Sequence, residues 1–73
     1  MQKTFELGSE YIALCDLLKV CGVSDSGGAA KHLVASGAVL VDGQQELRKT
    51  CKIRVGQQVR AEGMTITVVA GHG

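Results

Sequence analysis

A chain of 73 residues with a formal net charge of +1 is the size of one small domain, and its bulk charge points to neither a nucleic acid nor a membrane as partner. Its hydrophobic share of 45% is that of a globular protein, which argues against a disordered chain. Its only aromatic residues, Phe5 and Tyr11, are too few for a sheet of exposed rings that stacks on bases. We therefore expect a single domain over residues 1–73.

Three cysteines, Cys15, Cys21 and Cys51, are an odd number, and no apolar signal segment opens the chain. We expect a reduced, cytoplasmic protein without a membrane segment. No C-x-x-C spacing is present, and His32 and His72 stand apart from the cysteines, so buried cysteines that act as small apolar residues explain the pattern better than a zinc site does. We predict no metal and no cofactor.

The N-terminal part of the chain predicts a strand followed by a helix. Alternation of Phe5 and Leu7 indicates a short strand over residues 4–7. A helix is expected to begin at Ser9 or Glu10 and to end at Gly22. Its apolar stripe is expected to contain Tyr11, Leu14, Leu18 and Cys21, broadened by Ile12, Cys15 and Leu17.

A second helix that leads directly into a hairpin is predicted for residues 22–43, around which the rest of the chain is organised. Both Ser24 and Ser26 are suitable N-cap residues. The narrow apolar face of this helix contains Ala30, Leu33 and Val34. Gly37 is expected to end the helix in a left-handed conformation, and Asp42-Gly43 to form a two-residue turn after a strand over residues 38–41.

The C-terminal part predicts short strands and turns. Further strands are expected over residues 44–47, 51–55, 59–61 and 65–70, with turns at Gly56-Gln57 and Gly63-Met64 and a frayed tail over residues 71–73. In the segment 51–55, Cys51, Ile53 and Val55 are expected to be buried and the basic residues between them exposed. Two helices on a small, mostly antiparallel sheet make an α+β domain.

Motifs for catalysis are missing from the sequence. The carboxylates do not form pairs, no third group orients a Cys/His pair, and the glycines of S-D-S-G-G-A-A-K have neither the P-loop nor the dinucleotide-binding spacing. We predict that the protein is not an enzyme.

The distribution of charge is more informative than its sum. Arg48, Lys49, Lys52 and Arg54 are four of the eight basic residues, and no acid lies between Glu46 and Glu62, so we expect this basic segment not to be neutralised by its neighbours in sequence. It can serve as an anion-binding surface, or as a solvated edge strand whose charges prevent aggregation.

Lys31 allows two interpretations as well. Together with Gly27, Gly28 and the free N–H groups of a helix N-terminus it could form a phosphate cradle. Alternatively, the glycines could let the two helices approach closely while Lys31 extends into solvent.

Taken in order, these motifs resemble one family over residues 12–60. They are L-x-x-L-L at residues 14–18, S-G-G-A-A-K at 26–31, G-A-V-L-V-D-G at 37–43, a basic stretch, and V-G-Q-x-V at 55–59. The chain resembles the RNA-binding domain of small-subunit ribosomal protein S-four, the αL motif found also in certain tRNA synthetases, pseudouridine synthases and a heat-shock RNA-binding protein. Within that family it is most similar to the stand-alone bacterial YbcJ-like proteins, for which a basic strand like E-R-K-T-C-K-I is typical; here it is L-R-K-T-C-K-I at residues 47–53.

The resemblance implies binding of structured RNA, ribosomal or transfer RNA, by a monomer that acts with the ribosome or an RNA-modifying enzyme. The residues expected to bind RNA are Ser26, Lys31, Gly43, Arg48, Lys49, Lys52 and Arg54. The chain departs from the family pattern at Gly27, where many members have Arg, at Ala29, often Glu, and at Asp42, usually Asn. Two alternatives stay open: a protein-interaction module for an acidic partner, and an accessory domain that acts in trans with an enzyme.

Overall fold

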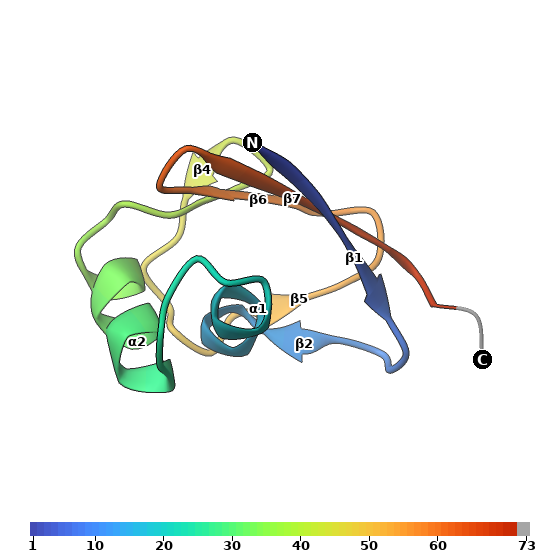
Figure 1. The fold of residues 1–73 in the computed structure, drawn as a ribbon, viewed down its shortest axis with the longest axis horizontal. Helices are drawn as coiled ribbons and strands as arrows, with labels where there is room; N and C mark the ends of the chain where they lie inside the picture. The colour runs from blue at the N-terminus through green and yellow to red at the C-terminus, as the bar shows by residue number, and fades with distance from the viewer. Residues whose placement is uncertain (72–73) are drawn as a thin grey trace.

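Residues 1–71, which the computed structural model describes, form two layers (Figure 1). A five-stranded sheet makes one layer, and two helices with a two-stranded sheet make the other. The elements are β1 (Gln2–Leu7), β2 (Ile12–Ala13), α1 (Leu14–Val20), α2 (Gly27–Ala35), β3 (Leu40–Val41), β4 (Gln44–Gln45), β5 (Lys52–Ile53), β6 (Gln58–Ala61) and β7 (Met64–Ala70). No helix among these residues is long and apolar enough to cross a membrane. His72 and Gly73, part of the tail expected to fray, lie outside the described residues.

The larger sheet has the strand order β1-β7-β6-β3-β4. β1 and β7 pair in parallel from Gln2↔Thr65 to Leu7↔Ala70, whereas the other neighbours are antiparallel. The smaller sheet pairs β2 with β5. The predicted α+β class with a mostly antiparallel sheet is confirmed. The parallel pair was not predicted, because it joins the two ends of the chain and leaves no local signal in either strand.

The core lies between the two layers. Its largest fully buried side chains are Leu14, Leu17, Leu18, Cys21, Val34, Val39, Ile53, Val59, Ile66 and Val68. Burial of one leucine side chain stabilises a fold by about 1.5–3 kcal/mol. α1 supplies three of these side chains, the leucines, which is more than any other element contributes.

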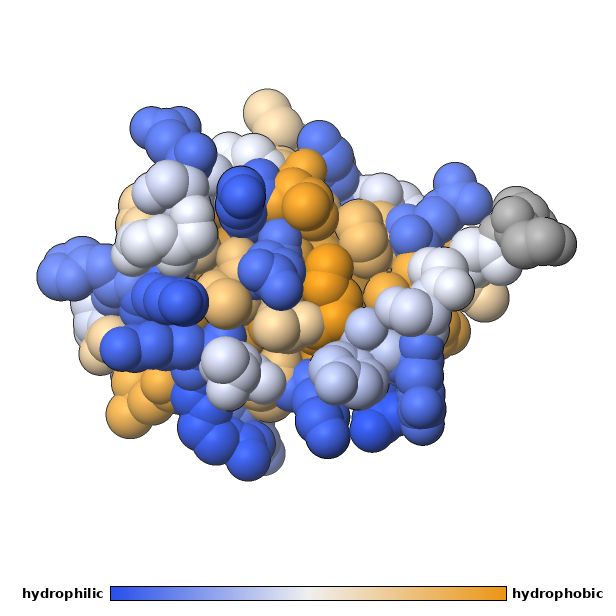
Figure 2. All heavy atoms as spheres, turned by 90° about the horizontal axis from the view of Figure 1, so that it is seen from below, coloured by the Kyte–Doolittle hydropathy of each residue, from blue (hydrophilic) through white to orange (hydrophobic). Residues whose placement is uncertain are grey.

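The outer surface of the helical layer is partly apolar. Figure 2 shows the molecule from below, the side on which α1 and β2 lie, with apolar residues near the centre and hydrophilic residues both among and around them. Val20 at the end of α1 is 57% exposed, and Ile12 and Ala13 of β2 are half-buried. Asp16 and Lys19 of α1 are exposed too, so this layer presents charged as well as apolar side chains.

α2 begins and ends as predicted. Of the two candidate caps, Ser26 is the one used, since its Oγ accepts a hydrogen bond from the Ala29 N–H at 3.1 Å. The helix ends at Ala35, and Gly37 adopts φ +84°, a left-handed conformation that glycine takes without steric cost.

The hairpin after α2 is confirmed too. Asp42 and Gly43 have φ values of 51° and 83°, as the two central residues of a type I′ turn require. They join β3 to β4 in the register Leu40↔Gln45 and Val41↔Gln44. The strand before the turn is shorter than predicted, although Val39 and Val41 are buried as expected.

The predicted start of the first helix is wrong. α1 begins at Leu14, not at Ser9 or Glu10, and Ile12 and Ala13 form β2, which pairs with β5. Tyr11 is consequently outside the helix and 42% exposed rather than part of its buried stripe. Tertiary pairing overrides the helical spacing here, because the same apolar residues also suit a short strand. The expected end of the helix at Gly22, with φ +80°, is confirmed.

The predicted strand over residues 51–55 is only partly present. β5 contains two residues, Lys52 and Ile53, and Val55 is 50% exposed rather than buried because it lies in the turn before β6. The next turn is formed by Glu62-Gly63 and not by Gly63-Met64, since Met64 already pairs with Ala61. β6 and β7 themselves agree with the expected strands.

Candidate nucleic-acid interface

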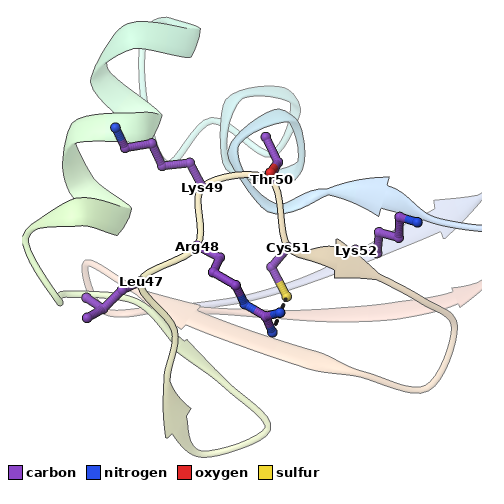
Figure 3. Close-up of a pocket in the computed structure, with 6 residues that line it drawn as sticks. All are labelled: Leu47, Arg48, Lys49, Thr50, Cys51 and Lys52. Atoms are coloured by element: carbon purple, nitrogen blue, oxygen red, sulfur yellow. Dashed lines mark hydrogen bonds between the residues drawn. The ribbon is translucent and has the colours of Figure 1, made fainter.

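The basic segment forms a tight turn followed by β5. The Cys51 N–H donates to the Arg48 carbonyl at 3.2 Å, which places Lys49 and Thr50 at the tip of the turn. Residues 47–52 line a shallow hollow (Figure 3). In this view Lys49 extends toward α2, whereas Lys52 points away from it. The segment is therefore an irregular surface with diverging cations rather than one flat basic strand face.

The basic turn is held in place by α1. The first two N–H groups of the helix, of Leu14 and Cys15, donate to the carbonyls of Cys51 at 2.9 Å and Lys49 at 3.0 Å. The N-cap residue Ala13 supplies no side-chain cap. Main-chain carbonyls of the basic turn thus replace the missing cap and satisfy donors that would otherwise have no partner in the helix. As a result, the backbone beneath Lys49 and Thr50 is fixed to the core helix.

Arg48 is paired with a neighbouring acid, contrary to the expected absence of neutralisation. Its guanidinium donates to both carboxylate oxygens of Glu46, at 3.0 and 3.2 Å, and its backbone N–H donates to Glu46 Oε2 at 2.9 Å. These bonds, first those from the side chain and then that from the backbone, lower the pKa of Glu46 to about 2. Partial burial raises the pKa of the nearby Cys51 thiol. The charge of Arg48 is therefore largely balanced within the turn.

Lys52 and Arg54 lie over the same aromatic ring. Lys52 Nζ is 5.0 Å and Arg54 Cζ 5.7 Å from the ring centroid of Tyr11, within the range of cation–π interaction. Arg54 also contacts Glu10 through a long ion pair of 3.4 Å between exposed side chains. Such an exposed pair contributes little, so Arg54 keeps most of its positive charge available.

The start of α2 offers exposed backbone. A Cβ added at Gly27 would meet no atom within 4 Å, and one at Gly28 would meet only Ser26 Oγ at 3.9 Å. These glycines are therefore not required for close approach of the two helices, which removes that interpretation. Lys31 is exposed on the second turn of α2. A Cβ on Gly37, just after this helix, would lie 3.8 Å from Leu47 Cδ2, so the end of α2 lies close to the start of the basic segment.

Gly43 and Ser26 are not brought together. α2 begins at the bottom of Figure 1, whereas the β3–β4 hairpin lies at its top. The Asp42 carboxylate is occupied within the protein, since it accepts from the Gln58 N–H at 2.9 Å and from Gln57 Nε2 at 3.2 Å. Of the predicted residues, Arg48, Lys49, Lys52 and Arg54 thus lie on one turn and the strand that follows it, with the hairpin tip at a distance.

Metal ligands do not gather in the described part of the chain, where no three His, Cys, Asp or Glu side chains could hold an ion together. Cys15 and Cys21 are buried, and burial raises the pKa of the Cys21 thiol. Both thiols therefore belong to the apolar core.

Comparison with known proteins identifies the fold. The model of the S4 domain family matches residues 5–69, which is nearly the whole chain. The chain belongs to the S4 domain family. The expected resemblance is thereby confirmed, and it extends beyond residues 12–60 to include the second half of β1 and most of β7.

Two S4 domain relatives are similar over most of their length. YbcJ of Escherichia coli (strain K12) is 52% identical over 68 residues, which are 92% of this chain and 97% of YbcJ. The “Probable ribosome maturation protein RlbA” of Bacillus subtilis (strain 168) is 35% identical over 63 residues, 86% of this chain and 89% of RlbA. The solution structure of E. coli YbcJ, described as revealing an αL motif involved in RNA-binding, matches with a TM-score of 0.72 and 51% identity over 92% of this chain and 86% of that chain.

Sequence reasoning missed two residues of this S4 domain surface. Tyr11 was assigned to the buried face of the first helix. The only signal against this assignment was that the break in structure at Gly8-Ser9 could extend as far as Tyr11. Glu46 was taken to lie outside the basic segment, although its position two residues before Arg48 allows a turn to bring the two together. Both depend on local backbone direction, which residue types alone do not specify.

Proposed function

We propose that this S4 domain binds structured RNA without catalysing a reaction, through the surface that runs from Lys31 across the basic turn to Arg54. The observation that carries the proposal is the pair of exposed lysines, Lys49 and Lys52, on backbone held by α1. Among the described residues neither lysine forms an ion pair, so both are available to phosphates. The E. coli YbcJ structure, with its RNA-binding αL motif, supports this assignment.

The dominant mode of binding is recognition of the RNA backbone. Phosphate contacts fix orientation and depend on Lys, Arg, hydroxyl groups and backbone N–H donors, all of which this surface presents. In the proposal Lys31, Lys49, Lys52 and Arg54 meet phosphates directly. Arg48 adds the N–H donors that Glu46 leaves unused. Ser26 contributes through the exposed first turn of α2, and Gly43 through the backbone of the hairpin tip, which only a long RNA would reach together with α2.

The proposed target is ribosomal RNA in the first place, with transfer RNA as the second choice. Similarity to RlbA, whose name refers to ribosome maturation, favours the ribosome. In this proposal the 73 residues act as one RNA-binding domain, monomeric and cytoplasmic, without a cofactor, beside the ribosome or an RNA-modifying enzyme.

Salt-dependent binding of matched variants tests the proposal. Lys49→Ala and Lys52→Ala should each weaken binding of ribosomal RNA fragments by a similar factor for different sequences, and each should reduce the slope of log K against log salt by about one. Lys19→Ala is the control, because Lys19 lies in the last turn of α1, at the other end of the helix from the basic turn. Fluorescence anisotropy at several salt concentrations gives both quantities.

An NMR titration places the interface. Amide shifts should concentrate at residues 26–31, at residue 43 and at residues 48–54, and should diminish as salt rises. Binding unchanged in both lysine variants would contradict the proposed surface. Shifts there with an acidic protein, but none with RNA, would instead assign the surface to protein interaction.

A further inference from the structure

Tyr11 is the exposed aromatic residue at the edge of the basic surface. It is the only tyrosine of the chain, which has no tryptophan. Its side chain lies outside α1, 42% exposed, with Lys52 and Arg54 over its ring. Core packing does not account for this ring, because Tyr11 belongs neither to the buried core cluster nor to the partly buried residues packed against it.

Backbone pairing fixes the position of this ring. β2 follows Tyr11 directly and pairs with β5 in the register Ile12↔Ile53 and Ala13↔Lys52, so that Tyr11 comes beside Arg54. On its other side, Ser9 Oγ donates to the Tyr11 carbonyl at 3.0 Å. The backbone that carries the ring and the two cations is thus positioned by the pairing of β2 with β5.

The tyrosine ring and the two cations match the chemical groups of a single nucleotide. A base has a flat apolar face that stacks on a tyrosine ring or on the plane of a guanidinium, and its phosphate pairs with an ammonium group. In a duplex the faces of the bases are covered by their neighbours, whereas an unpaired nucleotide in a bulge or loop can expose one. The basic turn and Lys31 have no aromatic partner of this kind in the described structure, so a base contact is confined to this end of the surface.

We propose that Tyr11, Lys52 and Arg54 form a contact site for one unpaired nucleotide of the bound RNA. The base packs against the exposed part of the Tyr11 ring and the Arg54 guanidinium, and Lys52 Nζ pairs with the adjacent phosphate. The site rests on the proposed RNA-binding function and deepens it: the preferred ligand is a duplex with an unpaired nucleotide beside it, rather than a fully paired duplex.

Two RNA duplexes that differ by a single unpaired adenosine test the site. The protein should bind the bulged duplex about tenfold more tightly than the fully paired one, the order of magnitude of one stacked base. Tyr11→Phe should keep this preference, and Tyr11→Leu should bring the ratio of the two affinities to about one. Val20→Ala, at another exposed apolar residue, is the matched control and should keep the ratio.

The ring signals of Tyr11 give a readout that a purely structural role would not change. Since the chain has a single tyrosine, ring-labelled tyrosine yields one set of signals. These signals should move upfield with the bulged duplex, as stacking requires, and stay nearly unchanged with the paired duplex. Equal binding of both duplexes by the wild-type protein, or an equal loss of affinity for both in Tyr11→Leu with unmoved ring signals, would overturn the site. Failure to bind either duplex would contradict the RNA-binding function itself.

Discussion

The two helices of this S4 domain begin in different ways. α2 is capped by its own sequence, since Ser26 lies directly before it and accepts from the Ala29 N–H. α1 has no side-chain cap, and its first N–H groups donate to carbonyls of Lys49 and Cys51, which follow more than thirty residues later in the sequence. The start of α2 is therefore local and can be predicted from residue types. The start of α1 forms only when the chain has folded, and it connects the proposed RNA-binding turn to the core.

The largest effect on stability is expected at Gly37, which follows the locally capped helix α2. A Cβ there would lie 2.6 Å from Gln45 Nε2, and φ is +84°. Gly37→Val should therefore lower the free energy of unfolding by about 2–3 kcal/mol, the cost of the left-handed conformation together with the loss of the bond from Gln45 to the Gly37 carbonyl. Chemical denaturation measures this. Gly8→Ala is the control, because a Cβ at Gly8 meets no atom within 4 Å. Equal denaturation midpoints for Gly37→Val and Gly8→Ala would contradict the proposed role of the left-handed conformation at Gly37.

Thr50→Pro should weaken the hydrogen bonds at the start of α1, although residue 50 is far from this helix in the sequence. Proline disfavours a turn conformation at the residue before it, here Lys49, whose carbonyl accepts from the Cys15 N–H. The expected loss is about 1–3 kcal/mol, the range for buried donors left without a partner. Amide hydrogen exchange should accelerate at Leu14 and Cys15. With Thr50→Ala the exchange at these sites should stay slow; if it rises equally, the backbone of the turn is not what caps α1.

The local start of α2 is expected to be less costly. Ser26→Ala should destabilise the protein by about 1 kcal/mol, the typical value of an N-cap residue. Exchange should increase at Ala29 and remain unchanged at Leu14. Ser24→Ala serves as control, since Ser24 is not the cap. A similar loss in both variants would show that the serines act through solubility or loop packing and not through the cap.

The smallest effect on stability is expected for Glu46, whose hydrogen bonds with Arg48 stabilise the basic turn. The pKa of Glu46 is about 2 in the folded protein, below its ordinary value of 4.5, so its bonds with Arg48 stabilise the fold above pH 4.5 and are lost as the pH falls toward 2. The difference in unfolding free energy between wild type and Glu46→Gln should be constant near neutral pH and shrink across that window. A difference that does not change with pH would exclude an ionised Glu46 as its source.

The sequence predicted best where structure depends on neighbours in the chain. The cap at Ser26, the left-handed Gly37 and the Asp42-Gly43 turn each follow from one or two residues, and the order of motifs indicated the family. The start of α1 was misplaced, because the apolar spacing around Ile12 fits a helix as well as a strand and only pairing with β5 decides between them.

The candidate surface was predicted in composition but not in form. The basic residues are exposed as expected, yet the turn that directs Lys49 toward α2, the pairing of Arg48 with Glu46 and the exposed ring of Tyr11 depend on backbone direction. The same holds for the parallel pairing of β1 with β7, which needs both ends of the folded chain at once.

The bond between Asp42 and Gln57 has a consequence for which residue pairs these two positions accept. Gln57 donates to the Asp42 carboxylate through Nε2 and accepts from the Arg54 N–H through Oε1 at 2.8 Å. With Asn at position 42, an amide N–H group could face the Gln57 amide, whereas a carboxylate at position 57 could accept from both sides. In this chain, residues 42 and 57 should accordingly behave as a matched donor–acceptor pair. In a double-mutant cycle, Asp42→Asn and Gln57→Glu should each cost stability alone and compensate each other when combined.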